Sequence, residues 1–165
     1  MRKIVFVYIA CALGLVIWME HVLEVNKEDF ESHLLSKYDE QFDVKSGMDF
    51  DKRLFAGAFK DKEGGIHKIY KVRDNVFLDN YCLYLFEDKY ENYLKESYSS
   101  IEEAKVEIDE ALYYFYQDKS FEEAIDRGLE YEMRIELKLA KDASRNEVKE
   151  LESLNHNYLE LTIKR

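Results

Sequence analysis

A run of sixteen uncharged residues near the N-terminus, Ile4 to Met19, is the feature that most constrains this chain. Basic residues precede the run and an acidic residue follows it. As a helix rising about 1.5 Å per residue it would span roughly 24 Å, somewhat less than the ~30 Å hydrocarbon core of a bilayer. Interfacial placement of Trp18 and extension of the basic side chains towards the headgroups would make up the difference. We therefore expect a membrane anchor with a short juxtamembrane segment over residues 1–24.

The flanking charges predict the orientation of this anchor. Arg2 and Lys3 place its N-terminal end in the cytoplasm, so the chain is expected to be a single-pass protein of the cell membrane with its C-terminal part outside. Two other interpretations remain open. The run could be a signal peptide cleaved at a small-x-small sequence such as Ala10-Cys11-Ala12. Alternatively, Cys11 could be lipidated, because the residues before it faintly resemble a lipoprotein cleavage box.

The rest of the chain is strongly acidic. The whole sequence has 24 basic and 35 acidic side chains, a net charge of −11, and without Arg2 and Lys3 the balance is 22 against 35, or −13. Such a surface is repelled by phosphate backbones, so nucleic acid is not expected as a partner. Another protein with a basic or neutral surface is expected instead. Cys11 lies in the apolar run and Cys82 far outside it, so these two cysteines are not expected to pair.

Periodicity in the first half of the remaining chain predicts helices at both ends and strands between them. Asn26 is a suitable N-cap for a helix that ends near Tyr38, and another helix is expected to begin at Asp79. Asp61 to Gly65 is typical of a five-residue hairpin loop that contains glycine. The three strands expected here are Gln41–Ser46, Arg53–Lys60 and Ile66–Arg73.

Three segments have the form Ser-x-x-Glu of a helix capping box, beginning at Ser100, Ser120 and Ser144. In a capping box the serine oxygen accepts a bond from a backbone N–H of the first turn, and the glutamate accepts one from the serine N–H. Apolar residues at helical spacing follow each serine, among them Ile101 and Phe115 after the first. We therefore expect a helix to begin at each of the three segments.

The apolar period changes to two between the last two of these helices. Apolar and charged residues alternate from Tyr131 to Leu139, and again from Leu159 to Ile163. Alternation predicts strands with one buried face. With the helix between them these strands form a β-α-β unit, and they should run parallel with a right-handed crossover if they share a sheet.

Together these elements predict an α+β fold in a single acidic extracytoplasmic domain over residues 25–165. We expect about five helices and about five short strands, in the order α-β-β-β-α and then α-α-β-α-β. The most plausible internal subdivision lies near residues 97–100, between these two halves.

A short stretch of the chain resembles a known group of proteins. Leu34-Leu35-Ser36-Lys37-Tyr38, then Phe42-Asp43-Val44, a hairpin, and Asp79-Asn80-Tyr81 are similar to segments of uncharacterised small membrane-anchored proteins of Gram-positive bacteria. The resemblance covers residues 34 to 94. It implies an extracytoplasmic setting, and it implies no activity and no functional residue.

No pattern in the sequence predicts catalysis, a cofactor or a metal site. His67 follows two glycines in the predicted hairpin and is interpreted as a surface histidine on an edge strand. The segment Asp49-Phe50-Asp51 lacks the glycine and final glutamate of a calcium-binding loop. Acidic residues recur on the helix predicted after Ser100, which is more typical of a solvated helix face than of a metal site. We therefore expect no enzymatic activity.

Tyrosines supply the candidate partner-binding residues. Tyr113, Tyr114 and Tyr116 cannot all share one face of a helix, so at least one is expected to be exposed, and Tyr84 lies off the apolar stripe of its own helix. Exposed tyrosine rings favour protein contacts because they bury a large area at low cost in conformational entropy. Packing of these rings within the core is the competing interpretation.

Three hypotheses for function follow. The first is a membrane-anchored extracytoplasmic protein-interaction module, such as an inhibitor or immunity-type protein or an accessory subunit of an envelope complex. The second is an envelope-acting hydrolase that uses paired carboxylates as acid and base. The third is a structural ectodomain without a specific ligand.

Overall fold

The chain has the predicted α+β fold, with helices and two small sheets that together contain seven strands. The computed structural model describes the backbone of residues 2–164 and the side chains of residues 7–164. It divides into two compact units, Met1–Asp79 and Asn80–Arg165, called the first and the second unit below. This boundary lies earlier in the chain than the predicted subdivision near residues 97–100.

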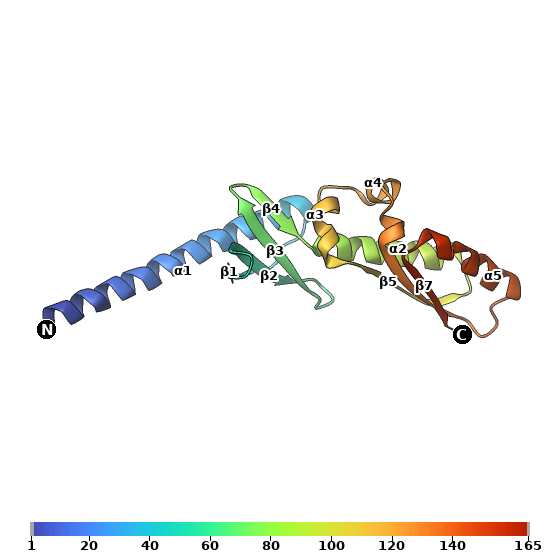
Figure 1. The fold of residues 1–165 in the computed structure, drawn as a ribbon, viewed down its shortest axis with the longest axis horizontal. Coiled ribbons are helices and arrows are strands. Elements are labelled where there is room, and N and C mark those ends of the chain that lie inside the picture. The colour runs from blue at the N-terminus through green and yellow to red at the C-terminus, as the bar shows by residue number, and fades with distance from the viewer. Residues whose placement is uncertain (1, 165) are drawn as a thin grey trace. The chain divides into compact units, whose positions relative to one another are not determined.

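The first unit begins with one long helix, α1 (Arg2–Tyr38), whose N-terminal half extends beyond the sheet of this unit (Figure 1). The helix predicted to start at Asn26 is the C-terminal part of α1, since the backbone continues through this position without a break. Side chains from Val7 to His21 are all exposed although most are apolar. Within the described residues, α1 is the one helix long and apolar enough to cross a membrane, a test that a signal sequence also passes.

Four antiparallel strands form the sheet of the first unit, in the spatial order β1-β2-β3-β4. The predicted hairpin is confirmed as β2 and β3, whereas the first strand begins at Lys45 and not at Gln41. The fourth strand was not predicted, because the two-residue turn Asp74-Asn75 before it lacks glycine; Asn75 adopts the left-handed φ of 60° that this turn requires. The strands are β1 (Lys45–Asp49), β2 (Leu54–Lys60), β3 (Ile66–Arg73) and β4 (Val76–Asp79).

The C-terminal half of α1 and the sheet form the core of the first unit. Phe30 and Leu34 on α1 are fully buried, and the ring of Phe30 meets the edge of the Phe77 ring at a centroid distance of 5.9 Å. Gly57 on β2 permits the close approach of α1 to the sheet, because a Cβ at this position would lie 2.9 Å from Phe30 and 2.5 Å from Val44. A larger residue at position 57 would therefore push α1 away from the sheet.

The second unit contains a three-stranded sheet in the order β5-β6-β7. Strands β5 and β6 are antiparallel and β6 and β7 are parallel, which confirms the predicted parallel pair around α5. The longest helix of the unit, α2, lies along β5, and α5 lies beside β7 (Figure 1). Its elements are α2 (Tyr81–Ser97), β5 (Ile101–Ile108), η1 (Glu110–Leu112), α3 (Tyr113–Tyr116), α4 (Phe121–Asp126), η2 (Leu129–Glu132), β6 (Met133–Leu139), α5 (Arg145–Ser153), η3 (Leu154–Asn157) and β7 (Glu160–Lys164).

The helix predicted after Ser100 is wrong, because residues 101–108 form β5. The pairing of β5 with β6 shifts between Ile101 and Glu103, as at a β-bulge, so Ile101 and Ala104 both face the core although they are three residues apart. This spacing imitates the i, i+3 spacing of a helix. Val106 and Ile108 continue with the period of two that a strand requires.

The other two capping boxes are confirmed. Ser120 and Ser144 each accept a bond from the backbone N–H of the glutamate three residues later, at 3.1 and 3.2 Å, and each glutamate accepts one in return from the serine N–H. These serines start α4 and α5. The Ser100 hydroxyl is buried and has no hydrogen-bond partner among the described residues.

Serine-to-alanine substitutions at Ser100, Ser120 and Ser144 should therefore differ in their effect on the free energy of unfolding. Ser120→Ala and Ser144→Ala each remove a cap and should lower the free energy of unfolding by about 1 kcal/mol. Ser100→Ala removes a hydroxyl that caps nothing and should leave stability within about 0.5 kcal/mol of the wild type. Urea denaturation followed by circular dichroism measures all three, and a loss at Ser100 as large as the other two would contradict the assignment of β5.

Candidate protein-interaction surface

The four predicted tyrosines differ in exposure. Tyr113 and Tyr116 are buried, whereas 51% of the surface of Tyr114 is exposed. Phe115 was predicted to lie on a buried stripe; it is 71% exposed, because the segment is a short helical turn after β5 and not the continuation of a long helix. Tyr84 is half-buried and stacks on the Tyr81 ring at a centroid distance of 5.7 Å. Of the four, Tyr114 is thus the one that presents most of its ring to a partner.

A groove between α2 and α4 holds Tyr93, an exposed aromatic residue that is not among the predicted tyrosines. Tyr93 is 54% exposed and lines a groove of about 510 Å³ together with the half-buried Phe121 and Ile125. Its position follows from its place on α2, next to the buried Leu94 and three residues after the buried Tyr90. Helical spacing alone predicts that the Tyr93 ring lies beside the apolar stripe of α2 and faces outward.

The polar side chains of this α2–α4 groove are mostly acidic. Lys89 lies within it, with its Nζ 2.6 Å from Glu122 Oε1 and 4.6 Å from the centre of the Phe121 ring. Glu96 and Asp126 also line the groove. Lys89 is thus held by a carboxylate and by the face of an aromatic ring. The groove has an excess of negative charge, because its lining includes three carboxylates and one ammonium group.

Most of the acidity of the protein belongs to the second unit. Of the net charge of −11, residues 80–165 carry −9, with 21 acidic against 12 basic side chains, and residues 1–79 carry −2, with 14 against 12. The groove therefore belongs to the strongly acidic part of the chain, where the potential attracts basic surfaces.

The buried Tyr90 and the half-buried Tyr158 form a pair on the inner side of α2. Tyr90 donates a hydrogen bond of 2.7 Å to Glu130, and its oxygen lies 3.1 Å from that of Tyr158. Burial, followed by the hydrogen bonds to these two residues, raises the pKa of Tyr90 above its ordinary value. This hydroxyl therefore stays protonated at neutral pH, where it links α2 to the segments before β6 and β7 as a structural contact.

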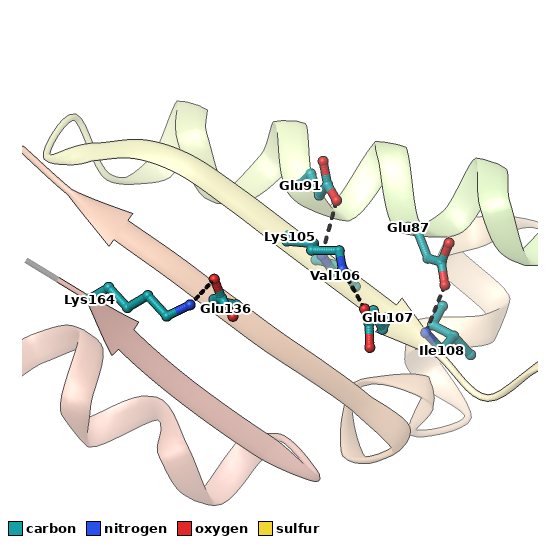
Figure 2. Close-up of polar contacts among 8 residues, drawn as sticks. All are labelled: Glu87, Glu91, Lys105, Val106, Glu107, Ile108, Glu136 and Lys164. Carbon is teal, nitrogen blue, oxygen red and sulfur yellow. Dashed lines mark hydrogen bonds and ion pairs between the residues drawn. The ribbon is translucent and has the colours of Figure 1, made fainter. Parts of the chain in front are cut away.

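Two glutamates of α2 occupy the outer edge of β5, as Figure 2 shows. Glu91 accepts a hydrogen bond of 3.0 Å from the backbone N–H of Val106, and Glu87 accepts one of 2.7 Å from that of Ile108. An edge strand presents backbone groups without a neighbouring strand, and here carboxylates take the place of that neighbour. In the first unit a helix carboxylate likewise bonds to the backbone: Glu31 of α1 accepts a hydrogen bond of 3.1 Å from the N–H of Val44, just before β1.

The Glu87 carboxyl has a perturbed pKa. Burial raises its pKa from 4.5 to about 7, and the nearby Glu91 and Glu107 carboxylates add to the effect. The Ile108 N–H and the Lys105 ammonium act in the opposite direction. A raised glutamate pKa is typical of general acids. The geometry gives Glu87 a structural role instead, since its carboxyl is engaged by the β5 backbone.

His67 is buried, which makes its interpretation as a surface residue wrong. Its Nε2 lies 2.6 Å from Asp61 Oδ2, and the exposed fractions of the two side chains are 8% and 3%. Asp61 Oδ1 also accepts bonds from the Glu63 and Gly65 N–H groups, at 2.9 and 2.8 Å. Burial acts to raise the pKa of Asp61, but the bonds from His67, Gly65 and Glu63 outweigh it and keep that pKa below its ordinary value. The pair closes the β2–β3 loop.

Comparison of the chain with family models, with curated proteins and with solved structures finds no match. The resemblance to membrane-anchored proteins of Gram-positive bacteria therefore stays a prediction. Within the described residues, no group of three or more His, Cys, Asp or Glu side chains is placed to hold a metal ion.

The pKa of Glu87 predicts how stability changes with pH. Between about pH 4.5 and pH 7 the folded protein keeps a proton that the unfolded chain has released, so the stability contributed by this group is full at low pH and declines as pH rises towards 7. Glu87→Gln keeps an oxygen for the Ile108 N–H and removes the titration. The variant should gain about 1 kcal/mol over the wild type at pH 8, after allowance for solvent screening, and should match it near pH 4.

Urea denaturation at a series of pH values measures this difference. Glu152→Gln, at an exposed position of α5, serves as the control for the loss of one negative charge. A stability difference between Glu87→Gln and the wild type that does not change with pH would contradict the predicted titration.

Proposed function

We propose that this chain is a membrane-anchored extracytoplasmic protein-interaction module, which binds a basic protein partner through the second unit. The observation that carries the proposal is the α2–α4 groove, in which the exposed Tyr93 and the half-buried Phe121 lie among acidic side chains. Aromatic rings in a groove supply buried area, and charges at its rim supply steering and specificity. An inhibitor or immunity-type protein and an accessory subunit of an envelope complex both fit this description.

The exposed apolar half of α1 supports the membrane part of the proposal. Apolar side chains such as Leu13, Val16 and Ile17 are each more than half exposed along this segment. Exposure of a continuous apolar helix to water is unfavourable, whereas the hydrocarbon core of a bilayer surrounds such a helix with apolar contacts on all sides. With the basic residues at positions 2 and 3 in the cytoplasm, residues 25–165 lie on the outer side of the membrane.

The charge of the second unit supports the choice of a basic partner. A net charge of −9 on residues 80–165 repels acidic proteins and anionic lipid headgroups and accelerates encounter with positive surfaces. Surface charges act over about 8 Å at physiological ionic strength, so the attraction weakens as salt rises. Aromatic contacts in the groove then hold the partner after the encounter.

The membrane part is tested by fractionation of cells that express the full chain. The wild type should remain in the membrane pellet after an alkaline carbonate wash and keep its N-terminal peptide in mass spectrometry. Leu13→Arg with Ile17→Arg should release the protein, because a charge at the centre of a membrane helix costs about 3 kcal/mol on insertion scales. The control is Val25→Arg with Leu35→Arg, at exposed positions of α1 outside the run. A soluble wild type that begins near Leu13 or Leu15 would contradict the anchor.

The partner-binding part is tested with a photo-cross-linking amino acid in place of Tyr93. In intact cells it should yield an adduct with one basic protein, and the yield in membrane extracts should fall as salt is raised. The control places the same amino acid at Tyr131, which is 62% exposed and does not line the groove. With the partner then purified, Tyr93→Ala should weaken binding about tenfold while the thermal melt is unchanged. Equal adducts from both positions would contradict the groove as the binding surface.

A further inference from the structure

We propose that β7 (Glu160–Lys164) is a self-association site, where two copies of this chain pair their β7 strands antiparallel across a two-fold axis. The proposal goes beyond the function proposed above, because its partner is a second copy and its surface is a sheet edge distant in sequence from the α2–α4 groove. Strand β7 is the last strand in the order β5-β6-β7, and among the described strands it pairs with β6 alone. Such an edge is a ready template for another strand.

The two edges of this sheet differ in how they are covered. At the β5 edge, Glu87 and Glu91 of α2 accept bonds from backbone N–H groups (Figure 2). No corresponding carboxylate bonds to the backbone of β7 among the described residues. The β7 edge is therefore the one that can still accept a strand.

The backbone of β7 presents its outward groups in a regular order. The Val106 and Ile108 N–H groups point to the outer edge of β5, so the β6 residues opposite them, Ile135 and Met133, direct their backbone groups towards β7. Alternate residues of a strand direct their backbone groups to opposite edges. In the parallel register Ile135 stands beside Leu161, so its backbone groups bond with Glu160 and Thr162. The N–H and C=O groups of Leu161 and Ile163 consequently point away from β6, towards an added strand.

The side chains of β7 alternate between two faces of different character. Leu161 is in register with Ile135 of β6, and Ile163 with Leu137, so these two half-buried residues belong to the apolar inner face. Glu160, Thr162 and Lys164 are exposed on the outer, charged face. The inner faces of two copies form one continuous apolar face only if inner residues stand opposite inner residues. A shift of the register by one residue would place the inner side chains of one copy opposite the outer side chains of the other.

Among the registers that satisfy this condition, the one centred on Thr162 matches the whole strand to itself. It places Glu160 opposite Lys164 of the second copy and Leu161 opposite Ile163 of the second copy, and the two-fold axis repeats both pairs. Moving the centre to Leu161 or Ile163 places a charged residue opposite Thr162 and leaves the other charge unmatched. The five-residue sequence Glu-Leu-Thr-Ile-Lys is thus complementary in both charge and apolar side chains to its own antiparallel copy.

The energetics favour a specific but moderate association. Pairing in this register adds about four backbone hydrogen bonds, places two opposite-charge pairs on the outer face and covers the half-buried apolar residues on the inner face. The net charge of −9 on each second unit opposes approach of two copies. Screening over about 8 Å at physiological ionic strength limits this repulsion, while cross-strand pairs lie well inside that distance.

A cysteine at the proposed axis tests the contact with the full chain in detergent micelles. Cys11 is exposed, so Cys11→Ser serves as the background for all variants, and Cys82 is buried. Directly opposed residues of a non-hydrogen-bonded antiparallel pair, as at Thr162, have Cα atoms about 4.5 Å apart, which suits a disulfide. Thr162→Cys should therefore form a covalent dimer on mild oxidation. Lys138→Cys, on the same face of β6, should not, because its copy would lie about three strand spacings away.

Charge reversal tests the register independently. Glu160→Lys alone and Lys164→Glu alone each create two like-charge pairs across the axis and should weaken the dimer about tenfold or more. An equimolar mixture of the two variants restores opposite charges in both pairs, so it should form heterodimers with nearly the affinity of the wild type. Within each chain the substituted residue also lies near Arg134 or Glu136 of β6, and these intramolecular effects are the same in the mixture as in the single variants. Recovery of affinity in the mixture therefore reports the contact between copies. Analytical ultracentrifugation measures the affinities, and circular dichroism checks the fold.

The proposal is overturned if Thr162→Cys cross-links no better than Lys138→Cys, or if the mixture associates no better than its components. A dimer that survives both charge reversals would place the contact elsewhere, for example in α1, and would also overturn it. These outcomes are separate from those of the earlier tests, since they depend neither on membrane retention nor on the Tyr93 adduct.

Discussion

The packing of one long helix against one face of a small sheet is the interaction on which both units depend. Sheets of three or four strands bury little surface, so a single helix must cover most of the inner face. In the first unit Phe30 and Leu34 of α1 fill this role, and Gly57 lets the helix approach. In the second unit the apolar stripe of α2 that includes Phe86 and Leu94 covers the sheet.

These helices also complete the hydrogen bonding of the strands. Glu87 and Glu91 of α2 each accept a bond from an N–H group on the outer edge of β5, and Glu31 of α1 accepts one from the N–H of Val44, just before β1. A carboxylate in such a position is partly desolvated, and the raised pKa of Glu87 is the electrostatic consequence. The perturbed titration of this residue thus follows from the architecture, without an active site.

The surfaces left over by this packing are where function is proposed. The outer flank of α2 carries Tyr93 beside α4, and the outer face and edge of β7 carry a self-complementary row of side chains. A groove and a strand edge recognise partners by different physics. The groove relies on aromatic area and acidic charge, whereas the edge relies on backbone hydrogen bonds that require a second strand in a matching register. The two can therefore be occupied independently.

Local patterns in the sequence are sufficient to predict the apolar N-terminal helix, the β2–β3 hairpin, the parallel pair β6–β7 and the capping boxes at Ser120 and Ser144, because each depends on local spacing or local hydrogen bonds. Other features depend on tertiary contacts, among them the continuation of α1 through Asn26. Residues 101–108 form a strand because a bulge and pairing with β6 outweigh helix-like spacing. His67 is buried because the hairpin folds Asp61 onto it. The exposure of Tyr93 and Tyr114, and the burial of Tyr113 and Tyr116, depend on which neighbours cover each ring. Such contacts join residues distant along the chain, and no local pattern encodes them.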